Sequence, residues 1–85
     1  MAAVGKRQTV GAAAAIIVPA GMRGILRNQD GANSVDLGGS GVTAGNGFEL
    51  KFGQTVEIVA RMGEDVYAIR SIAADVRVDA ILTRA

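Results

Sequence analysis

The 85-residue chain has no cysteine, no histidine and no tryptophan, and its few aromatic residues are Phe48, Phe52 and Tyr67. Without cysteine it can form neither a disulfide nor a thiolate metal site. Without histidine as well, it lacks the ligands that zinc and copper sites usually need. The sequence also shows no convergent acid–base pair. We therefore expect a protein that is not an enzyme and that uses no metal or other cofactor.

Neither sign of charge predominates. Nine basic and eight acidic residues give a formal charge of +1, and the two signs are interspersed along the chain. A nucleic-acid partner is not expected, because a basic stripe with stacking aromatics is missing. The apolar run from Val10 to Val18 is too short to span a membrane. Its alanines and Pro19 do not favour a signal peptide. We expect a soluble protein, made in the cytoplasm, with no membrane partner.

The missing histidine also predicts how stability depends on pH. No unperturbed side chain of this chain titrates between about pH 5 and 8. The melting temperature should therefore be nearly constant across that window. Thermal melts at several pH values measure it, and a steep change within the window would contradict the expectation.

Aliphatic residues and glycine are what the chain has in abundance. Half of its twelve glycines lie between Asn28 and Leu50, in a stretch without a paired acid and base. Glycine there suits tight turns between strands. A chain below the ~100–150 residues of a typical domain has a small core and gains burial by associating with copies of itself.

Apolar residues alternate with polar ones at period two, which indicates half-buried strands. We expect strands at 22–28, 34–37, 48–52, 55–61, 66–72 and 75–82. The fold class is therefore all-β, a small sandwich or barrel of the jelly-roll kind with about seven short strands. The residues from Gln8 to Val18 are rich in alanine but lack a helix cap, so we expect them to be extended. This divides the chain into an N-terminal arm, 1–18, and a single β domain, 19–85.

Three details of this prediction concern turns and faces. Asp30-Gly31 indicates a hairpin between the strands around Leu26 and Val35, and Asn46-Gly47 indicates a second tight turn. Type I′ turns at these sites would give Gly31 and Gly47 a positive φ. Phe48, Leu50 and Phe52 should share one buried face, and Tyr67 is expected in the core.

Polar motifs suggest weaker alternatives. The oxygens of Asp30, Asn33 and Asp36 could bind calcium, but their spacing is not that of a calcium loop. Gly38-Gly39-Ser40-Gly41 lacks the lysine of a phosphate-binding loop. Glu64 and Asp65 are adjacent in sequence, so in a strand they would point to opposite faces and could not act as an acid–base pair.

Several segments resemble small β-structured virion proteins of tailed bacteriophages, of the kind that decorate or cement the capsid. The segments are VPAGMRGILRN (18–28), SVDLGGSGVT (34–43), NGFEL (46–50) and DVYAI (65–69). The resemblance covers roughly residues 18–82. It implies a structural protein on the capsid surface of the virion, a homotrimer whose other partner is the major capsid protein. The same module resembles parts of tail and fibre proteins, which leaves open an adhesion module that binds a host glycan or protein.

The arm is the expected partner-binding segment. Its small side chains would allow an added strand along a neighbour's sheet edge. Basic residues within it would reach an acidic patch on the shell. The residues expected to contact a partner are Lys6, Arg7, Ile16, Ile17 and Val18.

Overall fold

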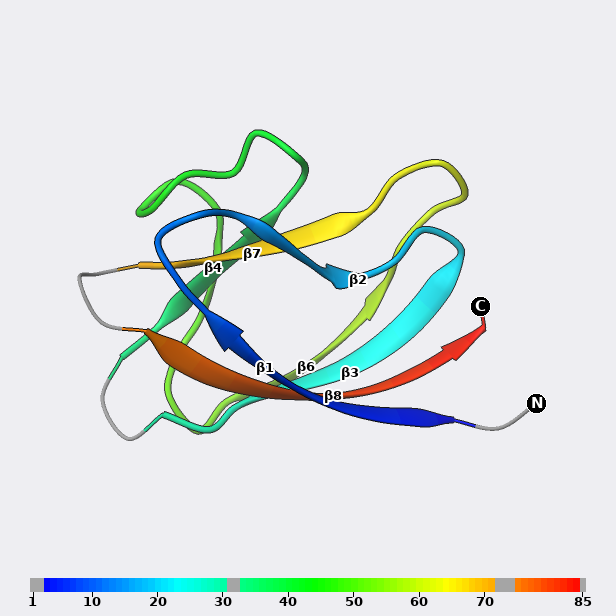
Figure 1. Cartoon of the computed structure of the whole chain (residues 1–85), viewed down its shortest axis with the longest axis horizontal. Helices are drawn as coiled ribbons and strands as arrows, with labels where there is room; N and C mark the ends of the chain where they lie inside the picture. Colours follow the sequence, from blue (N-terminus) through cyan, green and yellow to red (C-terminus); the bar gives the residue numbers. More distant parts are fainter. Residues whose placement is uncertain (1–2, 31–32, 72–74, 85) are drawn as a thin grey trace.

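The computed structural model describes residues 3–30, 33–71 and 75–84, and these contain eight strands and no helix. Two four-stranded antiparallel sheets face each other (Figure 1). We call the sheet with order β1-β8-β3-β6 sheet A and the sheet with order β2-β7-β4-β5 sheet B. The strands are β1 (Val4–Val10), β2 (Ala15–Val18), β3 (Met22–Asn28), β4 (Val35–Gly38), β5 (Phe48–Leu50), β6 (Thr55–Val59), β7 (Val66–Arg70) and β8 (Val76–Arg84).

The strand pairing shows that the sandwich is a rolled ribbon. Strand β1 pairs with β8, β2 with β7, β3 with β6 and β4 with β5. The chain therefore behaves as one long hairpin that doubles back between β4 and β5. Rolling this ribbon brings β3 beside β8 and β4 beside β7, which completes the two sheets. Eight antiparallel strands wound in this way form a jelly roll. The predicted all-β sandwich is confirmed.

Alternation along the strands builds the core between the sheets. Strand β8 buries Val76, Val78, Ala80 and Leu82 and turns the residues between them outwards. Sheet B covers them with residues such as Leu37, Leu50 and Ala68. Since each fully buried Val or Leu contributes roughly 1.5–3 kcal/mol relative to exposure, this aliphatic layer is the main stabilising element of a domain without large aromatic core residues.

Residues 4–18 differ from the extended arm that the sequence predicted. They supply β1, which pairs with β8 from Val4 to Val10, and β2, which pairs with β7. Val10, Ile17 and Val18 are fully buried. The sequence pattern missed this because both strands are short or polar on one face, and because their partners, β8 and β7, come near the other end of the chain. The boundary expected at residue 18 thus falls inside the sandwich.

The expected hairpin at Asp30-Gly31 is also not formed. Strand β3 belongs to sheet A and β4 to sheet B, so the two strands around Leu26 and Val35 do not pair. Gly31 itself lies outside the described residues. The two strands lie in different sheets because each pairs with later strands of the chain: β3 pairs with β6 and β8, and β4 pairs with β5 and β7.

The turn before β5 was predicted at Asn46-Gly47, but in the structure it is centred on Ala44 and Gly45. Asn46 donates its backbone N–H to the carbonyl of Thr43 at 3.0 Å, and Gly45 has the positive φ of 78°. Gly47 has no positive φ; a Cβ there would instead lie 2.8 Å from the carbonyl oxygen of Leu37. The glycine at position 47 is thus required by close packing and not by backbone conformation.

Asn28 joins the two sheets at the end of β3. Its side chain is fully buried, and its amide nitrogen donates to the carbonyls of Leu50 at 3.0 Å and Asn33 at 2.8 Å. Its side-chain oxygen accepts the N–H of Asp30 at 2.9 Å. Because Leu50 belongs to sheet B, one buried amide group holds the crossing segment and the edge strand β5 together.

Asp36 holds the long loop between β4 and β5. Its carboxylate is buried and accepts the backbone N–H of Gly45. Asp30 accepts the N–H of Asn33 at 2.6 Å. The residues weighed as a calcium site are therefore used to fold their own loops.

Candidate functional site

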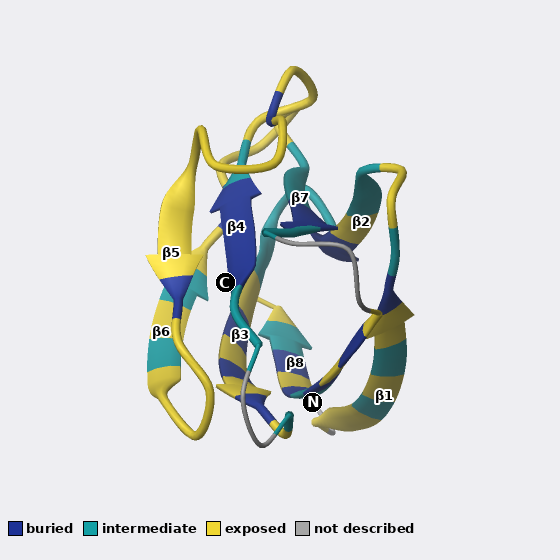
Figure 2. Cartoon of the chain, turned by 90° about the vertical axis from the view of Figure 1, so that its left-hand side faces the viewer, coloured by how far each residue is buried: buried dark blue, intermediate teal, exposed yellow. Residues whose placement is uncertain are grey.

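The sandwich is open along the side where both sheets end in an edge strand, β5 in sheet B and β6 in sheet A. These strands lie along the same side of the molecule, and most of their residues are exposed (Figure 2). A cavity of about 320 Å³ lies between them. We call it the edge cleft, and its lining residues are Leu37, Gly38, Gly39, Phe48, Ile58, Val59, Ala60, Arg61, Glu64, Asp65 and Val66.

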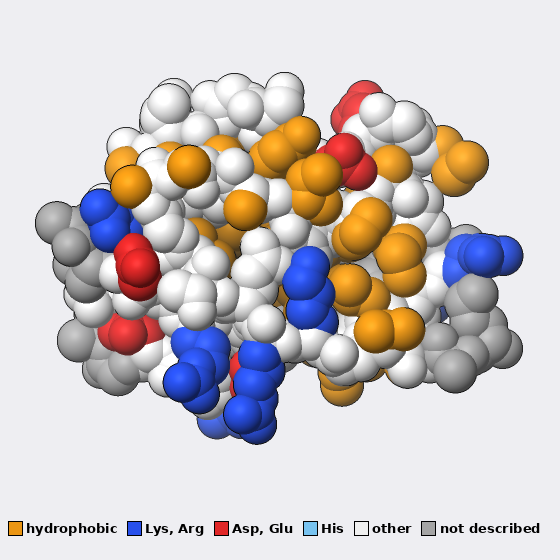
Figure 3. All heavy atoms as spheres, viewed as in Figure 1, with side chains coloured by type: hydrophobic (Ala, Val, Ile, Leu, Met, Phe, Trp, Pro, Cys, Tyr) orange, Lys and Arg blue, Asp and Glu red, His pale blue; other side chains and the backbone are white. Residues whose placement is uncertain are grey.

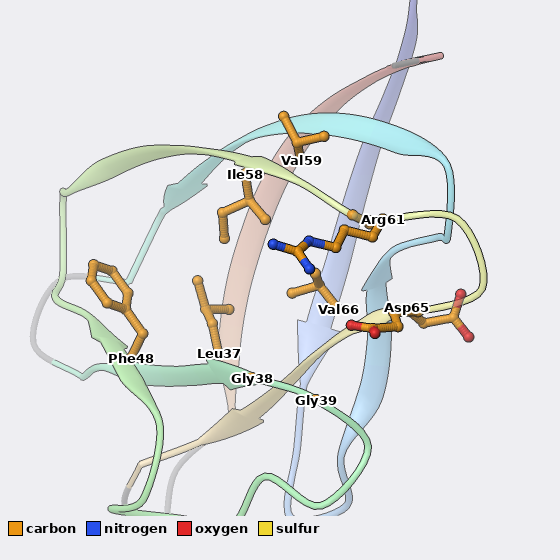
Figure 4. Close-up of a pocket in the computed structure, with 11 residues that line it drawn as sticks. Leu37, Gly38, Gly39, Phe48, Ile58, Val59, Arg61, Asp65 and Val66 are labelled. Carbon is orange, nitrogen blue, oxygen red and sulfur yellow. The ribbon is translucent and has the colours of Figure 1, made fainter.

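The cleft stays open because β5 is only three residues long. Leu50 is the one β5 residue that reaches the core, whereas Phe48 begins the strand and is 59% exposed. Phe48, Leu37 and Ile58 lie around the cleft in Figure 4, and no aromatic ring fills the space between them. Two of the aromatics expected in the core, Phe48 and Phe52, are therefore on the surface.

Strand β6 directs part of its backbone towards this open side. Ala60 donates its N–H to Met22 at 2.8 Å, and Asn28 donates to Gln54 at 3.1 Å. In an antiparallel pair the residues alternate between bonding to the partner strand and pointing away from it. The backbone N–H and C=O groups of Thr55, Glu57 and Val59 consequently point away from β3. Edge groups of this kind can accept an added strand.

A protruding turn stands beside the cleft. Glu64 donates its backbone N–H to the carbonyl of Arg61 at 3.1 Å, and Gly63 takes the positive φ of 82° that this tight turn requires. Met62 therefore lies at the tip of the turn and is 86% exposed. An exposed, unbranched thioether adapts readily to an apolar recess on another surface.

The charged groups at the rim are held by the fold. Asp65 accepts the backbone N–H of Ala20 at 2.8 Å, which links the turn at Pro19 to the turn at Met62. Arg61 extends across the cleft in Figure 4. A second, more polar hollow of about 420 Å³ lies next to the cleft, between Ser40, Glu64 and Tyr67. Tyr67 is half-buried at its wall and is not a core residue.

This site combines an apolar recess with a charged rim. The carboxylate of Asp65 accepts a hydrogen bond from the backbone N–H of Ala20. Within residues 3–30, 33–71 and 75–84, no group of three acidic, histidine or cysteine side chains is placed to hold a metal ion. The edge cleft can take an apolar side chain, and its rim can contribute hydrogen bonds and one cation.

The residues predicted to bind a partner do not share one surface. Ile17 and Val18 are fully buried, because the register of β2 shifts between Ile16 and Val18 and turns two successive side chains inwards. Ile16 is 38% exposed. Lys6 and Arg7 lie next to each other in β1, with Arg7 outward and its Nε 3.8 Å from Oδ1 of Asp79.

The edge cleft could hardly be predicted from the sequence. Its lining comes from β4, β5, β6 and the start of β7, which are brought together by the rolled ribbon. The one available signal was the closeness of Phe48 and Phe52 to glycines, which fits loop ends better than a central strand.

Comparisons of the chain with protein-family models, with curated proteins and with solved structures found no match. In the part of the chain that the structure describes, no helix is long and apolar enough to cross a membrane.

Proposed function

We propose that the chain is a bacteriophage capsid decoration protein, which binds the outside of the capsid shell and stabilises it as a homotrimer. The observation that carries the proposal is the apolar open side of the sandwich, where Phe48 and Val59 line the edge cleft and Phe52 and Met62 are exposed in the turns before and after β6. The segments that resemble phage decoration proteins support it independently. The activity would be binding alone.

The exposed apolar side has the size expected for association between small proteins. The four side chains together expose on the order of 400 Å² of apolar surface. A standard interface buries about 800 Å² from each partner, of which roughly three-fifths is apolar. The open side thus supplies most of the apolar part of one such interface.

Its shape also suits a closed ring of copies. The protruding turn at Met62 and the edge cleft are different features of the same side. If the turn of one copy enters the cleft of the next, the contact is heterologous, and such contacts close into rings when the rotation allows. A trimer on a shell would then repeat modest contacts many times over, which gives high avidity.

An adhesion module on the tail or fibre is the alternative. One observation favours it, since Phe48 and Phe52 are exposed and alternate in sequence with the exposed polar residues Glu49 and Lys51. Exposed aromatic faces next to polar groups are the kind of surface on which sugars stack. The two functions differ in copy number.

Stoichiometry in purified particles tests the proposal. Quantitative gel densitometry or mass spectrometry should find this chain in numbers comparable with the major capsid protein, in hundreds per particle. Tens of copies or fewer would favour the adhesion module, and absence from particles would reject both.

The oligomeric state gives a second test in solution. Light scattering after size exclusion should report about three times the 8.7 kDa chain mass. Met62→Glu should shift the protein to monomer, because it places a charge at the tip of the apolar turn. Val4→Glu is the matched control, since Val4 is 56% exposed on β1, at the opposite edge of sheet A. A wild-type monomer at tens of micromolar, or an unchanged Met62→Glu trimer, would contradict the assignment.

A further inference from the structure

Basic and acidic residues are interspersed in the sequence, but the fold separates many of the basic residues from the acidic ones. The strands of sheet A carry six of the nine basic residues and only two of the eight acidic ones. Sheet B and the connecting segments hold the other six acidic residues with three basic ones. In Figure 3 several Lys and Arg side chains lie along the lower edge of the molecule, where sheet A lies, and others lie at its centre and its two ends. The near-neutral chain therefore has one basic sheet.

The arginines point outwards from that sheet. Strands β3 and β8 bury every second residue, which leaves the side chains between them on the outer face. We call this outer face of sheet A the arginine face. Its charged and large apolar residues are Arg7, Arg23, Ile25, Arg27, Glu57, Val59, Arg77, Asp79 and Ile81.

Two of these arginines have partners on the face and two are available. Arg7 lies 3.8 Å from Asp79, and Arg23 Nη1 lies 3.7 Å from Glu57 Oε2. Among the described residues, Arg27 and Arg77 form no ion pair. Register places Arg27 across from Asp79, and Arg77 is two residues before Asp79 on β8. Asp79 is therefore outnumbered by the cations around it.

An apolar recess lies within the same face. Ile25 and Ile81 are directly opposite each other on β3 and β8 and are 44% and 52% exposed. They form a hollow of about 240 Å³ together with Arg23, Glu57 and Thr83. A recess of this kind accepts an aliphatic side chain, and the arginines around it favour carboxylates, which guanidinium groups bind in a planar fork.

We propose that the arginine face is a docking surface for an acidic protein surface, with an aliphatic side chain of the partner seated between Ile25 and Ile81. If the chain is a decoration protein, this is the face that meets the capsid shell, and that assignment rests on the proposed function. Proteins supply carboxylates beside aliphatic groups, whereas a nucleic-acid backbone supplies charge alone. The face also carries no aromatic ring on which a base could stack.

Individual contacts on this face are exposed, so each contributes little and is weakened by salt. Copies arranged on a lattice would add these contributions through avidity. The edge cleft lies between β5 and β6 and meets the arginine face only along β6, at Val59, so association between copies through the cleft leaves most of the arginine face accessible.

A direct binding experiment tests the proposal on the full chain without any capsid. The probe is a synthetic peptide of glutamates with one central leucine, titrated by fluorescence anisotropy at low salt. The double variant Arg27→Gln/Arg77→Gln should bind about tenfold more weakly than wild type. Backbone amide NMR signals of Ile25, Arg27 and Ile81 should shift when the wild-type protein binds.

The double variant Lys51→Gln/Arg70→Gln is the matched control, because it removes the same net charge at positions outside the strands of sheet A and outside the lining of the edge cleft. It should bind the peptide like wild type. The proposal is overturned if this control weakens binding equally, if a DNA duplex binds the same face more tightly than the peptide, or if a peptide with serine in place of leucine binds equally well. Peptide binding at the face without binding to capsids would support the docking surface and contradict the decoration role.

Discussion

Replacing Asn28 with aspartate should destabilise the protein by about 3 kcal/mol at neutral pH. The two side chains have nearly the same shape, so packing is unchanged. The aspartate cannot donate to the carbonyls of Leu50 and Asn33, and it places a buried negative charge beside both oxygens. For a domain of this size the melting temperature should fall by roughly 10–20 °C.

The pH dependence of this variant separates the electrostatic cause from a packing defect. Burial raises the pKa of the new carboxyl above its unfolded value of about 4. The loss in the free energy of unfolding relative to wild type should therefore grow as the pH rises from the unfolded pKa to the raised folded pKa. It should shrink towards pH 4, where the carboxyl is neutral and can donate one hydrogen bond. Gln29→Glu is the control, since it makes the same chemical change at the exposed neighbour. Equal melting temperatures of the two variants would show that Asn28 does not join the sheets as described.

Gly47→Ala should cost about 2 kcal/mol, through overpacking between the loop and sheet B. An added Cβ would lie 2.7 Å from Cγ2 of Val42 and 2.8 Å from the carbonyl oxygen of Leu37. The valine can move, but the carbonyl belongs to β4, which pairs with β5 at this point. Chemical denaturation followed by circular dichroism measures the loss in the free energy of unfolding.

Gly41→Ala is the matched control in the same loop. A Cβ at Gly41 meets no atom within 4 Å, and the residue has no positive φ. We expect a change within about 0.5 kcal/mol for this variant. If Gly47→Ala were equally harmless, the loop would not pack against β4 as closely as the structure shows.

The alternation of apolar and polar residues predicted most strands of this fold, because a strand with one buried face keeps this alternation in its sequence. Strand β3 extends over the residues expected for it, Met22–Asn28, and β8 begins one residue later than expected and ends at Arg84. The strands that escaped prediction are β1, with polar residues inside and out, and β2, whose irregular register buries Ile17 and Val18 together. Their place is set by pairing with β8 and β7, which local sequence does not encode.

The candidate surfaces were harder to foresee than the strands. Phe48 shares the periodic pattern of Leu50, and only the shortness of β5 leaves it uncovered. The basic sheet was concealed because arginines on β1, β3 and β8 are separated in sequence by acidic residues that fold into sheet B or the connecting segments. The strand topology places most basic residues on one sheet although the total charge is nearly balanced. A balanced composition therefore does not exclude a charged binding partner.

The rolled ribbon also constrains how the protein can be made. Among the eight strands of the described residues β1 is synthesised first, yet the strand it pairs with from Val4 to Val10 is β8, the last of the eight to be synthesised. At a synthesis rate of about 5–20 residues per second, the valines and isoleucines of β1 and β2 stay unburied for several seconds, until β7 and β8 have been synthesised. Because such non-local pairings form slowly, the nascent chain exposes unpaired strand edges during that interval. Yield in cells should therefore depend on chaperone supply and growth temperature more than the stability of the finished sandwich would suggest.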